Sequence, residues 1–389
     1  MDTNDLPLHS LNSDFIVQHY LLNLEFQEEL KECRGRVYIF IAPSSDKSGN
    51  LLILDCKDLY ITGVREISTN PTEVEDFLSS SRQRRSYDSY QSWVSKSHSS
   101  NRELKFTTEE WCIKIEIEDR NQTKLVYLEY KTTTRGNSLS CISDDDGGIC
   151  CITAGSLINN RSLFPYQDAP TLMSTWQLAV HVPSDFTVLS TGDEQGFSTN
   201  QNGMYFYTQT VLPLSTFALA IGKWQCRKME VNYSPSSSGN TTVECHHSSY
   251  PCYFDNEEKV IPCNIYSSKK VNVSRMMDYL PGCYQATCRV LGRPTVQKFD
   301  FLIVPESVAF LGLASPGLMF ISPSVLHGNE PMLDRLAHEI SHSWFGISLG
   351  PKNWNEEWIS EGFATFFEVR SFMFPFESLE TCGWLKAIK

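Results

Sequence analysis

Apolar and polar residues alternate along short segments in the first two thirds of the chain. In CIKIEIE, Ile113, Ile115 and Ile117 recur at every second position, so their side chains share one face of a strand. Similar strand-like runs are GRVYIFIA, LLILD, KLVYLEY, TWQLAVHV and MYFYTQTV, and turn residues separate them at short intervals. The pattern predicts a large, mainly antiparallel β domain over residues 1–264.

The period of the pattern changes after residue 264. SRMMDYLPGCYQATCRVLG is largely helical in spacing although Pro281 interrupts it, and FDFLIVP has the pattern of a short buried strand. The remainder favours helices, which predicts a second, helix-rich domain over residues 265–389. The expected fold class is therefore α+β.

Three segments rich in Ser, Asn and Gly interrupt the β domain, near residues 79–103, 132–148 and 234–242. Their low apolar content predicts mobile surface loops. The first segment contains Arg82, Arg84 and Arg85, which is typical of a solvated loop and less often of a sequence that a nuclear import receptor binds.

Composition and charge narrow the possible functions of this 389-residue chain. Apolar residues make up 41% and aromatic residues 12%, which indicates a folded protein with sizeable cores. The formal charge of −13 disfavours a partner with a polyanionic surface, so we expect neither nucleic acid nor an anionic membrane. Asp2 and Asp5 stand where a secretory signal carries positive charge, and no run is long enough to span a bilayer. We expect a cytoplasmic protein, with the nucleus as the weaker alternative.

The chain has 13 cysteines at irregular spacing, and this pattern favours reduced structural thiols over a disulfide framework. The residues that could form a second metal site are Cys245, His246, His247, Cys252 and Cys263. They lack paired CxxC spacing and lie among Ser, Asn and Gly, so a site there is the less favoured interpretation.

The segment NEPMLDRLAHEISHSWFG has the signals of a helix with defined ends. Asn329 can cap it, Pro331 stands where a missing N–H costs least, and Gly346 can end it. Within HEISH, His338 and His342 are four residues apart, so both imidazoles project from the same face on adjacent turns. The spacing predicts a pair of zinc ligands.

Glu339 and Glu361 complete this predicted metal site. Glu339 follows the first histidine, beside the metal position, where it can take a proton from zinc-bound water. In WNEEWISEGFATFFE, Asn355 can cap a further helix, and antiparallel packing would bring Glu361 to the metal as a third ligand. Three protein ligands leave one position open, as in catalytic zinc sites. The alternative is a helix with two partly buried histidines and a surface Glu.

Together, these two motifs resemble those of the gluzincin zinc aminopeptidases, in the branch of aminopeptidase B and leukotriene hydrolase. The likeness extends upstream to HYLLNLEF at 19–26, to NRSLFPYQDAPTLMSTW at 160–176 and to VLPLSTFALAIGKW at 211–224. It implies a saddle-like β domain followed by a thermolysin-like catalytic domain. It also implies one Zn²⁺ per chain held by His338, His342 and Glu361, with Glu339 as the general base.

The resemblance implies an aminopeptidase that hydrolyses peptides from the N-terminus, with basic N-terminal residues plausible as substrates. Gln167 falls at a family position that lines the pocket for the N-terminal end of the substrate. FLGLASPGLMF stands where the family has a GxMEN strand that pairs with the bound peptide, which makes Gly312, Ala314 and Ser315 substrate-binding positions. Ala314 replaces the family's ammonium-binding Glu, and Glu306 is one candidate to take its place.

The resemblance also implies a chain that is truncated at its C-terminal end. The family's oxyanion-stabilising Tyr lies some tens of residues after the third ligand, and no Tyr follows Glu361 here. This departure leaves two further interpretations open. One is a catalytically inactive zinc protein that binds a peptide or partner, and the other is an epoxide hydrolase with a deep apolar pocket.

Overall fold

The structure is a computed structural model, and the chain divides into two compact units. The first comprises Met1–Ser143, Gly147–Lys223 and Lys352–Asn355, and the second comprises Asp144–Asp146, Trp224–Pro351 and Glu356–Lys389. The residues that the structure describes are 7–27, 29–79, 86–96, 101–120, 122–153, 160–198, 203–233, 259–292, 294, 296–327 and 330–373.

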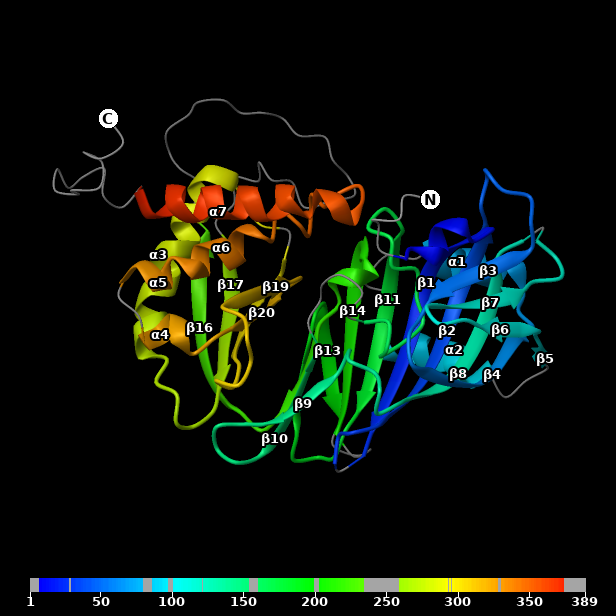
Figure 1. Cartoon of the computed structure of the whole chain (residues 1–389), viewed down its shortest axis with the longest axis horizontal. Helices are drawn as coiled ribbons and strands as arrows, with labels where there is room; N and C mark the ends of the chain where they lie inside the picture. The colour runs from blue at the N-terminus through cyan, green and yellow to red at the C-terminus, as the bar shows by residue number, and fades with distance from the viewer. Residues whose placement is uncertain are drawn as a thin grey trace. The chain divides into compact units, whose positions relative to one another are not determined.

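An eight-stranded sheet forms the centre of the first unit (Figure 1). Its strands, in spatial order, are β13 (Asp193–Ser198), β14 (Met204–Pro213), β11 (Met173–His181), β1 (Phe15–Phe26), β2 (Cys33–Pro43), β8 (Lys124–Thr132), β4 (Leu59–Ile67) and β5 (Asn101–Glu103). The β1–β11 pair is parallel and the other pairs are antiparallel. The prediction of a mainly antiparallel β domain is therefore confirmed.

Two smaller sheets complete the β structure of this unit. The four-stranded sheet contains β12 (Thr187–Ser190), β15 (Leu219–Gly222), β10 (Ile149–Thr153) and β9 (Ser140–Ser143), and the three-stranded sheet contains β3 (Leu51–Asp55), β7 (Cys112–Glu116) and β6 (Phe106–Thr108). Short 3₁₀ turns lie at η1 (His9–Asn12) and η4 (Leu214–Thr216). The predicted apolar face of Ile113, Ile115 and Ile117 is fully buried.

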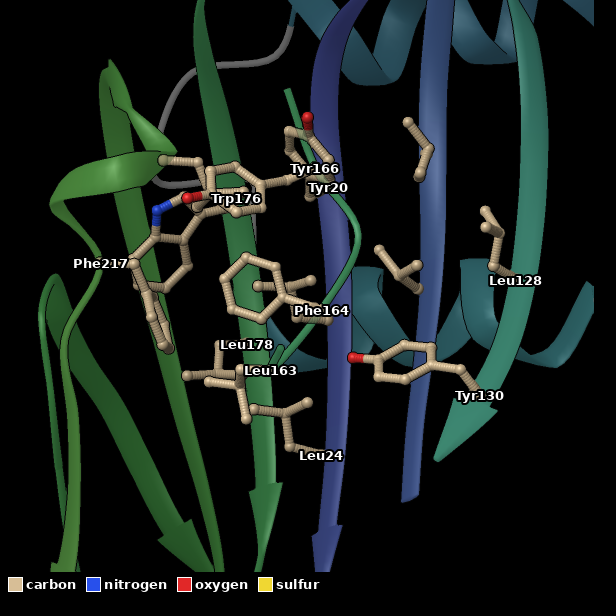
Figure 2. Packing of buried hydrophobic residues seen from close by; sticks show 14 of the residues in the cluster. Tyr20, Leu24, Leu128, Tyr130, Leu163, Phe164, Tyr166, Trp176, Leu178 and Phe217 are labelled. Carbon is tan, nitrogen blue, oxygen red and sulfur yellow. The ribbon is translucent and has the colours of Figure 1, made fainter. Parts of the chain in front are cut away.

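One large apolar core joins strands that are far apart in sequence. Figure 2 shows Phe164, Tyr166, Trp176 and Phe217 packed together within it. The ring of Phe164 meets the rings of Tyr166 and Phe217 edge-on at centroid distances of 5.3 and 5.2 Å. Edge-to-face contacts of this kind add to the stability that burial of the rings provides.

A second apolar cluster corrects the interpretation of the first Ser-rich segment. The helices α1 (Pro71–Ser79) and α2 (Tyr87–Ser95) place Phe77 and Trp93 against Phe40 on β2, and Tyr90 of α2 lies against Phe206 on β14. Within 79–103, α2 and β5 are ordered elements, so the prediction of a loop fails there. Tyr and Trp at i and i+3 bury a helical face even in a segment of low average hydropathy. Arg82, Arg84 and Arg85 lie outside the described residues.

The second Ser-rich segment is also partly ordered. β9 lies within 132–148 and pairs with β10, where a disulfide joins the directly opposed Cys141 and Cys151. The expectation of reduced thiols is therefore wrong for these two cysteines, because strand pairing brings together positions that sequence spacing did not single out. The other described cysteines do not form disulfides. The third segment, 234–242, lies outside the described residues.

A five-stranded sheet organises the second unit. Its spatial order is β16 (Gln225–Tyr233), β17 (Lys259–Ser267), β18 (Phe299–Ile303), β20 (Leu318–Ile321) and β19 (Gly312–Ser315). Because β16 and β17 pair with each other and β17 pairs with β18, both strands belong to this sheet. The division between the units therefore falls at residues 223–224. The predicted boundary at 264 comes too late, since strand periodicity alone does not reveal which sheet a strand joins.

Four helices form an apolar core with this sheet, namely α3 (Ser274–Leu291), α4 (Ser324–His327), α5 (Glu330–Leu333) and α6 (Arg335–Ser341). The helix α7 (Glu357–Met373), which follows the 3₁₀ turn η5 (Trp354–Glu356), packs on α3 and α6. Pro281 lies inside α3, which continues through it as one helix. Contacts among α3, α6 and α7 place the HEISH segment beside α7 (Figure 1). None of the described helices is both long and apolar enough to cross a membrane.

Candidate metal centre

The α6 helix presents two histidines toward α7. His338 lies in the last turn of α6, and His342 is its C-terminal capping residue with helical φ and ψ angles of −61° and −19°. The four-residue spacing therefore keeps its helical geometry, and the two Nε2 atoms are 3.1 Å apart. Both side chains are largely shielded, with 2% of the His338 side chain and 11% of the His342 side chain exposed.

The α7 helix brings Glu361 to the same point. Its carboxylate oxygens lie 3.4 Å from Nε2 of His338 and 3.6 Å from Nε2 of His342. Donors bound to one tetrahedral zinc ion at about 2.0–2.2 Å would be separated by about 3.3–3.6 Å. The two separations that involve Glu361 fall in this range, and the separation of 3.1 Å between the two Nε2 atoms is slightly shorter. His338, His342 and Glu361 are the group with metal-binding spacing within the described residues.

Hydrogen bonds at Nδ1 fix the orientation of both imidazole rings. Nδ1 of His338 lies 3.0 Å from a carboxylate oxygen of Glu368, and Nδ1 of His342 lies 2.9 Å from the carbonyl oxygen of Phe345. Hydrogen bonds at Nδ1 leave Nε2 as the ligand atom, as in many metal sites. Glu368 was missed by sequence reasoning. Its signal is the spacing of seven residues from Glu361, two helical turns along the same face of α7.

Charges in this cluster are strongly coupled. Burial alone would lower the pKa of His338, but its bonds to Glu361 and Glu368 raise it to about 9. The bond to His338 lowers the pKa of Glu361, and burial lowers the pKa of His342. An anionic carboxylate and a neutral imidazole are the forms that bind a metal ion, so Glu361 and His342 are held in the ligand forms. A metal ion would take the place of the proton that His338 shares with Glu361.

Glu339 lies beside the ligands and is almost completely buried, with 1% of its surface exposed. Burial raises the pKa of its carboxyl group to about 7, against the opposing effect of nearby cationic groups. Nε of Arg335 lies 3.7 Å from its Oε1. A carboxyl group with a pKa near neutrality can both accept and release a proton at physiological pH.

The edge strand β19 covers the Glu339 carboxylate. A Cβ atom at Gly312 would lie only 2.1 Å from Oε1 of Glu339, so any side chain at this position would require the Glu339 carboxylate to move. Ala314 is partly buried, and Ser315 is buried with a hydroxyl group that has no hydrogen-bond partner. The structure thus brings Gly312, one of the three predicted β19 positions, directly to the metal centre.

Gln167 has a different environment from the predicted one. Its side-chain carbonyl accepts a hydrogen bond from the N–H of Val17, and its amide group donates one to the carbonyl of Phe15, both at 2.9 Å. The residue is 3% exposed and connects its loop to β1 inside the first unit. The prediction that it lines a substrate pocket does not fit this placement, because both polar groups of the side chain are bound to backbone.

The ends of the two helices also differ from the sequence expectation. Asn329 lies outside the described residues, and the predicted single helix is divided at Asp334 into α5 and α6. Gly346 has a φ of +101° and comes five residues after α6 ends. Asn355 lies within η5, before the first residue of α7, and its N–H donates to the side chain of Asn353.

The alternative zinc site is not supported by the described part of the chain. Cys263 is buried in β17, and burial raises the pKa of its thiol well above the ordinary range, which disfavours the thiolate form that binds zinc. Its four suggested partners, Cys245, His246, His247 and Cys252, lie outside the described residues.

Models of two protein-domain families match this chain. The Peptidase M1 N-terminal domain matches residues 16–217, and the Peptidase family M1 domain matches residues 293–386. Human aminopeptidase O is 36% identical over 293 residues, which cover 68% of this chain and 36% of that protein. Rat aminopeptidase B is 30% identical over 234 residues, covering 59% of this chain and 31% of that protein. The chain therefore spans about a third of the length of these relatives.

Solved structures share the fold. Yeast LTA4 hydrolase has a TM-score of 0.69 at 19% identity and covers 92% of this chain and 49% of its own. An M1 zinc metallopeptidase from Deinococcus radiodurans has a TM-score of 0.67 at 16% identity, with coverage of 96% and 74%. Within the predicted branch, the altered GLASP strand and the Ser-rich inserts favour a likeness to aminopeptidase O. The sequence comparison confirms that likeness.

Proposed function

The chain belongs to peptidase family M1, and on that premise we propose that it binds one Zn²⁺ and removes the N-terminal residue of peptides. The observation that carries this proposal is the convergence of His338, His342 and Glu361, whose donor atoms lie within 4.8 Å of one another. The burial of Glu339 next to this group supports its role as the general base.

The chain's own residues suit a hydrolytic mechanism. Zinc bound by the three ligands would supply Lewis-acid polarisation of a carbonyl group and lower the pKa of water. Glu339 would accept a proton from the attacking water molecule and deliver it to the leaving amine. Glu368 holds the His338 ring in the orientation that presents Nε2, and Gly312 leaves the space that the Glu339 carboxylate occupies.

Peptides with basic N-terminal residues are the substrates that we propose. The formal charge of −13 is compatible with attraction of cationic peptides. A cytoplasmic location is also part of the proposal.

A zinc-containing binding protein without catalytic activity is the second candidate. The observation in its favour is β19, which reads GLAS and has no carboxylate to hold the ammonium group of a substrate. This candidate predicts that Glu339→Gln leaves function unchanged, whereas His342→Ala destabilises the second unit.

The first experiment combines zinc stoichiometry with hydrolysis of aminoacyl fluorogenic amides by the 389-residue chain. We expect one zinc per chain and turnover that Glu339→Gln abolishes while zinc content stays the same. Zinc binding without turnover of any amide would contradict the aminopeptidase proposal and favour the binding protein.

A further inference from the structure

The carboxylate of Glu357 has an environment that neither the predicted metal site nor the folding of α7 accounts for. Glu357 is the first residue of α7, and its Oε2 atom is buried without any hydrogen-bond partner. Among the described residues, it is the one carboxylate oxygen in this condition. Buried polar groups are nearly always paired in native proteins, because an unpaired one loses its hydration without compensation.

The position of Glu357 on α7 makes it a neighbour of the metal ligand Glu361. It lies four residues before the ligand Glu361 on the same helix, and side chains at this spacing are neighbours with Cβ atoms about 5–6 Å apart. Burial and the nearby charge of Glu361 both raise the pKa of Glu357, which is consistent with two adjacent carboxylates. The neighbouring Glu361 lies close to two histidines, whereas Oε2 of Glu357 has no hydrogen-bond partner in the described part of the chain.

The helix N-terminus does not by itself explain the unpaired oxygen. Both Glu356 and Glu357 lie at the start of α7, where the helix dipole favours negative charge. Only Glu357 has a buried and unpaired carboxylate oxygen. The two adjacent carboxylates are thus close to the same helix end, but the buried, unpaired oxygen belongs to Glu357.

A cationic group of a bound ligand would supply the partner that Oε2 of Glu357 lacks. The β19 strand carries no acidic side chain, so it cannot neutralise a cation that enters the site. Glu306, the other acidic candidate, is exposed on its loop. We propose that Glu357 binds the cationic group of the substrate, either the α-ammonium group or a basic side chain, in place of a carboxylate on β19. This inference rests on the proposed function, because it assigns the substrate cation to the same metal site.

The test measures binding of small amides by calorimetry to the zinc-loaded chain in a Glu339→Gln background, so that no ligand is consumed. Leucine amide carries only the α-ammonium group, N-acetylarginine amide carries only the guanidinium group, and N-acetylleucine amide carries no cation. Glu357→Gln is compared with the matched variant Glu356→Gln, and zinc content is measured for each.

We expect Glu357→Gln to weaken the binding of one cationic amide by about 10- to 100-fold, as for loss of a charge-assisted hydrogen bond. The affinity for N-acetylleucine amide and the zinc content should stay the same. The amide that loses affinity identifies the bound group as ammonium or guanidinium. Glu356→Gln should change every affinity by less than about twofold, because the inference assigns the cation to Glu357 and not to Glu356.

Three results would overturn the inference. Unchanged binding of both cationic amides would show that Glu357 does not contact the cation. Equal loss for the neutral amide would indicate general damage to the site, and loss of zinc would make Glu357 a positioning residue for the metal. Turnover by the chain with Glu339 intact is measured separately. Absence of turnover together with Glu357-dependent binding would refute the proposed function and leave the cation site in place.

Discussion

At the scale of single residues, the side chains around the metal centre are so closely packed that an added methyl group would displace one of them. Gly312 on β19 has no side chain, and the Glu339 carboxylate fills the volume that a Cβ atom would occupy. The carboxylate of Glu368 is bonded to Nδ1 of His338, and the carbonyl oxygen of Phe345 is bonded to Nδ1 of His342. The site is therefore sensitive to small changes at residues that bind no metal themselves.

The first prediction concerns Gly312→Ala. The added methyl group would displace the Glu339 carboxylate, so we expect hydrolysis of aminoacyl amides to fall by at least about tenfold, since misplacement by about 1 Å can cost about 100-fold. Zinc content should stay near that of the unchanged chain. Gly362→Ala is the matched control, because a Cβ atom at Gly362 meets nothing within 4 Å. Equal activity of the two variants would contradict the proposed role of the close contact.

The second prediction concerns Glu368→Gln. Loss of the carboxylate partner of His338 should weaken zinc binding by about 10- to 100-fold, because second contacts of this kind orient the ligand and raise its basicity. Competition with a chromophoric chelator measures the effect. Glu357→Gln serves as a comparison on the same helix, since Glu357 has no bond to a ligand imidazole. Unchanged zinc affinity in Glu368→Gln would contradict the orienting role.

At the scale of elements, a short helix in a polar segment can bury large aromatic side chains that the average hydropathy of the segment does not reveal. The α2 helix buries Tyr90 and Trp93, and the Trp93 ring lies edge-on to Phe40 at a centroid distance of 5.1 Å. This packing covers the face of the eight-stranded sheet that the main core does not occupy. The Ser-rich segment around α2 thus contributes to the stability of the first unit.

The third prediction follows from this packing. Trp93→Ala should lower the free energy of unfolding of the first unit by about 3–5 kcal/mol, as is usual when a large buried aromatic side chain is removed. Ser92→Ala, at an exposed position of the same helix, should change it by less than about 0.5 kcal/mol. Denaturant unfolding followed by tryptophan fluorescence and circular dichroism measures both. A small effect of Trp93→Ala would show that α2 is only loosely held against the sheet.

At the scale of the whole molecule, the two units have separate apolar cores, and the metal ligands all belong to the second. A ligand that binds only the folded form stabilises the unit that holds it. Zinc should therefore act on one part of the chain and leave the unfolding of the other unchanged.

The fourth prediction is a two-step thermal unfolding profile in which zinc raises only one transition. Zinc at 100 times its dissociation constant should add about 2.7 kcal/mol to the stability of the second unit, and chelation should remove this increment. Differential scanning calorimetry with and without chelator measures the shift. His342→Ala is the control and should abolish the response to zinc. An equal shift of both transitions would contradict assignment of the metal to one unit.

Local patterns in the sequence were sufficient to predict many of the strands and helices and the principal site residues. The strand period around Ile113 and the four-residue spacing of His338 and His342 are local properties, because side-chain direction repeats with the backbone geometry of a strand or helix. The likeness to peptidase family M1 came from motifs that are continuous in sequence, and the family models confirm it.

Only the tertiary structure decided which distant segments meet. It assigned β16 and β17 to the second sheet, paired Cys141 with Cys151, and placed Gln167 against β1. It also brought Glu368 to His338 and left Oε2 of Glu357 buried without a hydrogen-bond partner. These contacts depend on strand order and helix packing, which residue periodicity does not encode, because a periodic pattern specifies a buried face but not the surface that covers it.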